Sequence, residues 1–102
     1  MIIIYLTCVD DEEAHKISVA LLEARLIACA KKSVINSSYW WEGKINHNNE
    51  TLIMMETNEE KYDDIEKVVA SLHSYDEFVL TAVPVLKFNS GVQEWLDDNL
   101  TS

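Results

Sequence analysis

The fold is decided by the stretch Ile2-Ile3-Ile4-Tyr5-Leu6-Thr7, a continuous run of β-branched and apolar side chains. Such a run is typical of a strand that protein covers on both faces. Successive side chains of a strand point to opposite faces, so the alternating positions of this run make both faces apolar. The sequence therefore predicts a sheet in which neither face is left to water.

Two amphipathic helices are predicted further along the chain. Asp10 and Glu13 have the spacing of a capping box, so the acidic run there is interpreted as a helix start rather than a cation site. Thr57 repeats this spacing with the glutamate three residues later. The helices are expected to end near Leu26 and His73. Their apolar faces consist of Ala14, Ile17, Leu21, Ala24 and Ala28, and of Tyr62, Ile65, Val69 and Leu72.

Most of the remaining chain is expected to form strands. Residues 27–41 alternate like a strand that is long enough to bend or to extend beyond its own sheet. Residues 43–49 have polar turn chemistry, so residues 50–56 should return as the hairpin partner. Residues 78–83 predict a fourth strand, and Pro84 indicates a sheet edge or a strand end.

The element order is then βαββαβ followed by a short helix. It predicts an α+β, ferredoxin-like sandwich, with a four-stranded antiparallel sheet and two helices on one face. Residues 1–102 are interpreted as a single domain, because glycine and proline are scarce and no linker is visible. The uncovered apolar face must pack on another subunit, so an obligate oligomer is expected. The final helix should be capped by Asn89 or Ser90 and be apolar at Val92, Trp95 and Leu96.

The charge of the chain excludes several classes of partner. The 102 residues include 18 Asp+Glu and 8 Lys+Arg, a formal charge of -10. An acidic surface repels phosphate groups, so neither nucleic acid nor a membrane is an expected partner. The N-terminal run lacks the basic segment and the cleavage site of a signal peptide. Cys8 and Cys29 form no CxxC pair, so we expect a reduced, cytoplasmic protein.

Several motifs resemble the CutA family of divalent-cation tolerance proteins. The most specific is Tyr39-Trp40-Trp41-Glu42-Gly43-Lys44, because three consecutive aromatic residues before a turn are rare by composition. The resemblance covers nearly the whole chain and implies a tight homotrimer in which long hairpins pack edge to edge across subunits. The other matching segments are Leu26-Ile27-Ala28-Cys29-Ala30, Glu50, Thr57, Leu72-His73-Ser74-Tyr75 and Trp95-Leu96.

The family name implies a link to copper and other divalent cations, with His73 and Cys29 as the candidate ligands in this chain. Leu6 stands where some members have a proposed ligand cysteine, and Leu72 stands where they have the first of two histidines. Leucine cannot bind a metal, so fewer than the three or four ligands of a tight copper or zinc site remain. No cofactor is expected to be required, and a divalent cation such as copper is the one that the resemblance suggests.

The resemblance also implies an inter-subunit cleft for a metal ion or a small ligand. Two departures from the family pattern fall there. Glu56 replaces a lysine, which should weaken the binding of an anionic ligand. The loop after His73 lacks two prolines and should be less rigid. The residues expected in the cleft or in trimer packing are Tyr39, Trp40, Trp41, Lys44, Glu50, Tyr75 and Trp95.

The strongest of these candidates also have a structural interpretation. His73 would suit the C-terminal end of the second helix, where an imidazole can interact with the last carbonyls. Cys29 would suit close packing as a small apolar side chain. The aromatic side chains of Tyr39, Trp40 and Trp41 would suit either a ligand-stacking platform or, more commonly, the anchor of an interface.

Together these features predict a non-enzymatic, cytoplasmic, CutA-like homotrimer associated with tolerance of divalent metals. One alternative is a PII-like signalling module that binds a small effector in its inter-subunit clefts. Another is a small enzyme on the same scaffold, for which His73 with Glu50 or Tyr75 is the acid–base pairing to test.

Overall fold

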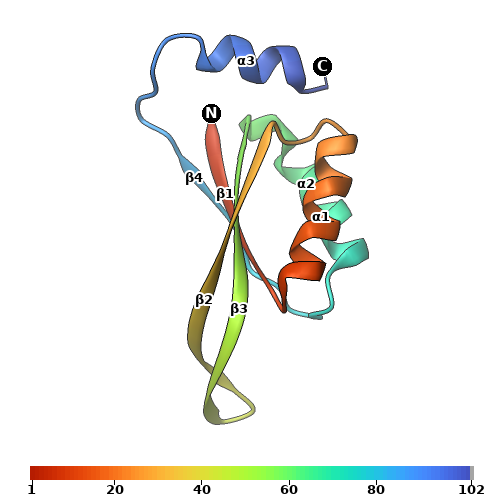
Figure 1. The fold of residues 1–102 in the computed structure, drawn as a ribbon, viewed down its shortest axis with the longest axis vertical. Coiled ribbons are helices and arrows are strands. Elements are labelled where there is room, and N and C mark those ends of the chain that lie inside the picture. Colours follow the sequence, from red (N-terminus) through yellow and green to blue (C-terminus); the bar gives the residue numbers. More distant parts are fainter. Residues whose placement is uncertain (102) are drawn as a thin grey trace.

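A computed structural model describes residues 1–101 and has the predicted order of elements (Figure 1). None of the helices in these residues is long and apolar enough to cross a membrane. The strands are β1 (Ile2–Cys8), β2 (Cys29–Trp41), β3 (Lys44–Thr57) and β4 (Leu80–Pro84). The helices are α1 (Asp11–Glu23), the short 3₁₀ helix η1 (Glu59–Lys61), α2 (Tyr62–Leu72) and α3 (Val92–Asn99).

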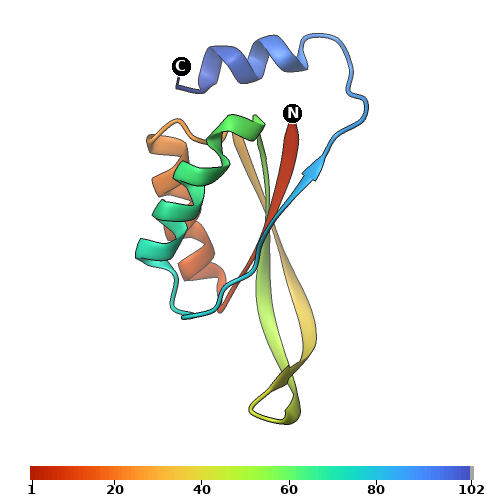
Figure 2. The same ribbon diagram turned by 180° about the vertical axis from the view of Figure 1, so that it is seen from behind.

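The four strands form one antiparallel sheet in the order β2-β3-β1-β4. Helices α1 and α2 lie side by side on one face of this sheet, as both views show (Figures 1 and 2). The predicted ferredoxin-like arrangement is therefore confirmed. Helix α3 lies near the N-terminus, at the end of the molecule opposite the β2–β3 turn (Figure 1).

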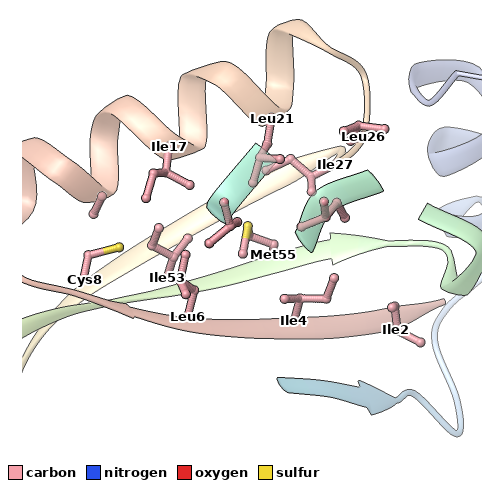
Figure 3. Packing of buried hydrophobic residues seen from close by; sticks show 13 residues of the cluster. Ile2, Ile4, Leu6, Cys8, Ile17, Leu21, Leu26, Ile27, Ile53 and Met55 are labelled. Atoms are coloured by element: carbon pink, nitrogen blue, oxygen red, sulfur yellow. The ribbon is translucent and has the colours of Figure 1, made fainter. Parts of the chain in front are cut away.

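The core lies between the sheet and the two helices (Figure 3). In β1 every second side chain, from Ile2 to Cys8, is buried against the helices, and the side chains between them are half-buried. Strand β3 repeats this pattern around Ile53 and Met55, which are fully buried. The half-buried side chains of both strands face away from the helices. The predicted sheet with two apolar faces is therefore present, and no helix of the described part of the chain covers its outer face.

Strands β2 and β3 extend well beyond the rest of the sheet. Strand β1 pairs with β3 only as far as Cys8 and Thr51, whereas β2 and β3 remain paired as far as Trp41 and Lys44. We call this two-stranded extension, residues 35–50, the hairpin arm. It reaches far below the helices in Figure 1.

The prediction of a turn over residues 43–49 is wrong. The turn consists of Glu42 and Gly43, which both have positive φ angles, 50° and 76°. Two such residues make the two-residue turn whose twist matches that of antiparallel strands. Strand β3 therefore starts at Lys44, and the polar residues that suggested a turn lie in an exposed strand.

Helix α1 ends at Glu23, and the prediction that it ends near Leu26 is wrong. Arg25 has a left-handed backbone with φ 57°, and the N–H groups of Arg25 and Leu26 bond to the carbonyls of Leu22 and Leu21. This bonding pattern is the Schellman motif, which terminates a helix. Its signal is usually a glycine, and an arginine occupies that position here.

The predicted helix caps have different outcomes. Asp10 caps α1 as expected, because its carboxylate accepts the Glu13 N–H at 2.9 Å. Thr57 does not cap the second helix, since its hydroxyl donates to the carbonyl of Leu26 instead. Helix α3 starts after Gly91, which has φ 89° and provides no side-chain cap, so Asn89 and Ser90 are not its caps. The fourth strand begins at residue 80 rather than 78.

Candidate functional site

The end of β1, the start of α1 and the loop after α2 meet at His73, whose side chain is fully buried. Its Nε2 lies 2.9 Å from the carbonyl oxygen of Thr7, and its Nδ1 lies 3.0 Å from the backbone nitrogen of Tyr75. These contacts require the neutral tautomer, in which Nε2–H donates to Thr7 and Nδ1 accepts from Tyr75. The rings of Tyr75 and Phe78 pack beside the imidazole. His73 therefore holds the loop against β1 and has no free nitrogen.

Glu13, in the first turn of α1, holds the same loop from the other side. Its Oε1 accepts the Val9 N–H at 3.0 Å and its Oε2 accepts the Ser74 N–H at 2.8 Å. Burial alone would raise the pKa of Glu13, but the hydrogen bonds from Ser74 and Val9 lower it. Glu13 is thus an ionised carboxylate that joins two segments far apart in the sequence.

Cys8, Glu13 and His73 place a sulfur, an oxygen and a nitrogen within 4.8 Å of one another. These donor types suit zinc or copper. Burial and then the charges of Glu13, Asp10 and Glu50 raise the pKa of Cys8 to about 12, so the thiol keeps its proton when no metal is bound. His73 has no free lone pair, and both oxygens of Glu13 accept hydrogen bonds. In this arrangement the three residues do not fit a resident metal ion.

Glu50 and Tyr75 form a second group next to this cluster. Glu50 lies on β3 immediately beyond the last pair with β1, and only 6% of its surface is exposed. The Tyr75 hydroxyl donates to Oε2 of Glu50 at 2.5 Å. Burial, this hydrogen bond and the charge of Glu50 raise the pKa of Tyr75, so the phenol keeps its proton and remains a donor. Two residues predicted for the cleft are thus in direct contact.

Tyr39 extends this group along the hairpin arm. Its hydroxyl accepts a hydrogen bond from the Asn48 side chain, and Tyr39 is near enough to Tyr75 to contribute to the raised pKa of Tyr75. Ser38 and His47 form a cross-strand pair, with Oγ and Nδ1 2.8 Å apart. Asn48 also lines a hollow of about 380 Å³ with Asn36, Ser37, Ser38, His47 and Asn49.

The other predicted cleft residues do not join this group within one chain. Trp40, Trp41 and Lys44 lie at the exposed end of the hairpin arm, where 73% of the surface of Trp40 is accessible. Trp95 lies on α3, at the opposite end of the molecule (Figure 2). Any contact between these residues and Glu50 would need a second subunit.

Cys29, the second predicted metal ligand, is far from His73. Cys29 opposes Glu56 on β3, and Glu56 in turn opposes Ile3 near the start of β1. His73 contacts Thr7 at the other end of β1, so one chain cannot place both residues on one metal ion. Glu56 forms an ion pair with Lys31 at 2.7 Å, which offsets much of the charge expected from the lysine-to-glutamate difference.

Sequence reasoning missed Cys8, the contacts of Glu13 with the loop, and Asn48. The position of Cys8 in the alternating pattern of β1 indicates burial, and this signal was available. Glu13 was recognised as part of a helix cap, but its bond to Ser74 spans 61 residues and has no local signal. Asn48 was assigned to a turn.

Comparisons with known proteins agree with this architecture. Residues 2–99 match the model of the CutA1 divalent ion tolerance protein family. A divalent-cation tolerance protein CutA from Pyrococcus horikoshii is 36% identical over 96 residues, which are 94% of each chain. A protein of the same description from Thermotoga maritima is 33% identical and covers 98% of this chain and 99% of its own.

Solved structures agree as well. The crystal structure of CutA1 from Pyrococcus horikoshii has a TM-score of 0.96 at 33% identity and covers 100% of both chains. That of CutA1 from Oryza sativa has a TM-score of 0.94 at 30% identity, with coverage of 98% of this chain and 93% of its own. This chain therefore belongs to the CutA family of divalent-ion tolerance proteins.

Proposed function

We propose that the chain acts as a non-enzymatic homotrimer in the cytoplasm and contributes to tolerance of divalent metals such as copper, without a tight metal site inside one chain. The observation that carries the assembly is the outer face of the sheet. Met54 and Leu52 oppose Tyr5 and Thr7 there, and α1 and α2 lie on the other face of the sheet. An apolar sheet face of this extent is unfavourable in water and is typical of an interface between subunits.

The hairpin arm supports the same assembly. A two-stranded hairpin is only marginally stable alone, and this one exposes Trp40, Trp41 and Ile45. The segment after β4 exposes Leu86 and Phe88. These apolar side chains are suited to pack on another copy of the chain.

Light scattering over a range of micromolar concentrations tests this part of the proposal. We expect the mass of three chains, and a monomer at every concentration would contradict it. The two free cysteines, Cys8 and Cys29, suit a reducing compartment such as the cytoplasm. Fractionation of cells that express the untagged protein would test the location.

The geometry around His73 supports a role without catalysis and without tight metal binding. An acid–base role would need a nitrogen that can take up and release a proton, but both nitrogens of His73 are engaged. The thiol of Cys8 keeps its proton, and both oxygens of Glu13 already accept hydrogen bonds. A metal response would therefore act through the assembled trimer rather than through a preformed site in the monomer.

Calorimetric titration with Cu²⁺ and Zn²⁺ tests this point. We expect no stoichiometric binding at micromolar affinity, and we expect His73→Ala to change nothing. Tight binding that His73→Ala abolishes would contradict the proposal. Copper tolerance is tested separately, by expressing the chain in a host that lacks its own CutA and measuring growth with added copper, where restored growth is expected.

The PII-like alternative draws support from the buried carboxylate of Glu50, which would suit a small ligand. Glu13 and Asp10 add negative charge near it. A nucleotide would be repelled there, because its phosphates are anionic. Nucleotide titration should show no micromolar affinity.

A further inference from the structure

Among the described residues 1–101, Glu50 is a buried carboxylate with no cation beside it. Only 6% of its surface is exposed, and the salt bridges among residues 1–101 join Lys31 to Glu56 and Lys32 to Asp11, but none reaches Glu50. A carboxylate taken out of water is unfavourable unless a positive charge or several hydrogen bonds compensate it. Tyr75 supplies one hydrogen bond, to Oε2. Within residues 1–101 no hydrogen bond reaches Oε1 of Glu50, and this oxygen is not among the fully buried atoms that lack a partner, so a ligand can reach it from solvent.

The groups around Glu50 include further hydrogen-bond acceptors and further negative charge. Asn48 lies two residues earlier on the same face of β3, and its side-chain nitrogen donates to the Tyr39 hydroxyl, which leaves the Asn48 carbonyl oxygen available. The phenol oxygen of Tyr39 lies against the side-chain amide of Asn48. Glu13 and Asp10 contribute further negative charge at the end of β1. The surroundings of Glu50 therefore favour a cation that carries N–H donors.

We propose that Glu50, Tyr75, Asn48 and Tyr39 form a binding site for an alkylammonium group. One ammonium balances one carboxylate, and its N–H groups match the free oxygens of Glu50 and Asn48, while the aromatic rings favour a cation beside them. Hard divalent ions need about six oxygen ligands and usually more than one carboxylate, which this group lacks. Copper and zinc prefer nitrogen and sulfur donors, whereas the acceptor atoms of this group are oxygens.

Two sources can supply this ammonium. One is a free primary amine, and the other is the side chain of a lysine from a second copy of the chain. Lys44 and Lys87 are exposed and lie in the segments that carry the exposed apolar side chains of the proposed interface. The site itself is independent of the proposed metal response, so a negative copper result leaves it unaffected.

The test is a calorimetric titration of the purified full chain with n-butylammonium chloride at neutral pH and constant ionic strength. We expect saturable binding, no binding of butyrate, and affinity for tetramethylammonium that is about tenfold weaker, because that ion has no N–H donor. Glu50→Gln, which keeps an acceptor for Tyr75, should weaken binding by about tenfold or more. Glu66→Gln, which changes an exposed carboxylate on α2, is the control and should leave binding unchanged.

The second source gives a different pattern. If a lysine of another copy fills the site, wild type takes up no butylammonium, whereas Lys44→Ala or Lys87→Ala binds it, and Glu50→Gln lowers the mass measured by light scattering. Either pattern supports the proposal. It is overturned if no variant binds butylammonium and Glu50→Gln keeps the wild-type mass, or if tetramethylammonium binds as tightly as butylammonium. Tyr75→Phe, with about a fivefold effect expected, serves if Glu50→Gln does not fold by circular dichroism.

Discussion

The hairpin arm and the rest of the sheet, which we call the base, share strands β2 and β3. They differ in what covers these strands. In the base, Ile53 and Met55 are fully buried under α1 and α2 (Figure 3). In the arm, the same two strands keep an unbroken ladder to Trp41 and Lys44, yet 73% of the surface of Trp40 is exposed. Backbone pairing is therefore not what distinguishes the two regions. The base can fold on the contacts of one chain, whereas the arm needs a partner surface.

The largest loss of stability should come from a substitution in the core of the base. Leu6→Ala removes a fully buried side chain from β1, so we expect the free energy of unfolding to fall by about 2–5 kcal/mol. Urea denaturation at fixed protein concentration measures it. Leu22→Ala, on the outer side of α1 where 40% of the residue is exposed, should cost about 0.5 kcal/mol or less. An equal loss of unfolding free energy in both variants would contradict the placement of Leu6 in the core.

A substitution in the hairpin arm should weaken the association of subunits. Trp40→Ala removes the most exposed of the aromatic side chains, and as an interface anchor it should weaken association by about 2 kcal/mol, or roughly thirtyfold. Light scattering over a dilution series measures the shift in mass. Leu22→Ala is again the control and should dissociate like wild type. A dilution curve for Trp40→Ala that matches wild type would mean that the arm is no interface.

The free energy of unfolding should depend on pH through Glu13, which lies near the junction between the base and the hairpin arm. The pKa of Glu13 is lowered below its usual 4.5 in the folded chain. Its stabilising contribution is therefore fully present above pH 4.5 and is lost as the pH falls through the lower folded pKa. Glu13→Gln should cost about 1–3 kcal/mol at neutral pH and reduce this acid dependence. Glu12→Gln, an exposed neighbour, should do neither when unfolding is followed between neutral and acidic pH.

The smallest effect should come from the turn of the arm. Glu42 has a positive φ angle, which asparagine tolerates better than glutamate. Glu42→Asn should therefore raise the free energy of unfolding by about 0.5 kcal/mol. Thermal or urea unfolding measures the gain. Glu59→Asn lies outside the turn and should give none, and a loss in Glu42→Asn would contradict the turn geometry.

The order of elements could be predicted because it depends on local periodicity. The alternation in residues 2–7 and the three- to four-residue repeats of the helices are set by neighbours along the chain. The prediction was wrong where the signal was atypical. Arg25 ends a helix at a position where glycine is usual, and the polar residues of the arm resembled a turn because an exposed strand need not be apolar.

The candidate site could be predicted only in part. Glu50, Tyr75 and Tyr39 were expected in an inter-subunit cleft or in trimer packing, and the structure brings them together within one chain. His73 and Cys29 were expected as ligands, and the structure places them at opposite ends of β1. Spacing in the sequence carries no information about which end of a strand a later loop will reach.

The sequence by itself determined the order of elements, the two apolar faces of the sheet and the family, because these properties reside in short patterns and in residue identity. Tertiary structure alone decided that hydrogen bonds occupy both nitrogens of His73 and both oxygens of Glu13, and that Glu50 lies buried with no cation beside it among residues 1–101. Hydrogen-bonding capacity and charge compensation depend on atoms that come together from distant segments. A residue's chemistry is therefore defined only after the chain has folded around it.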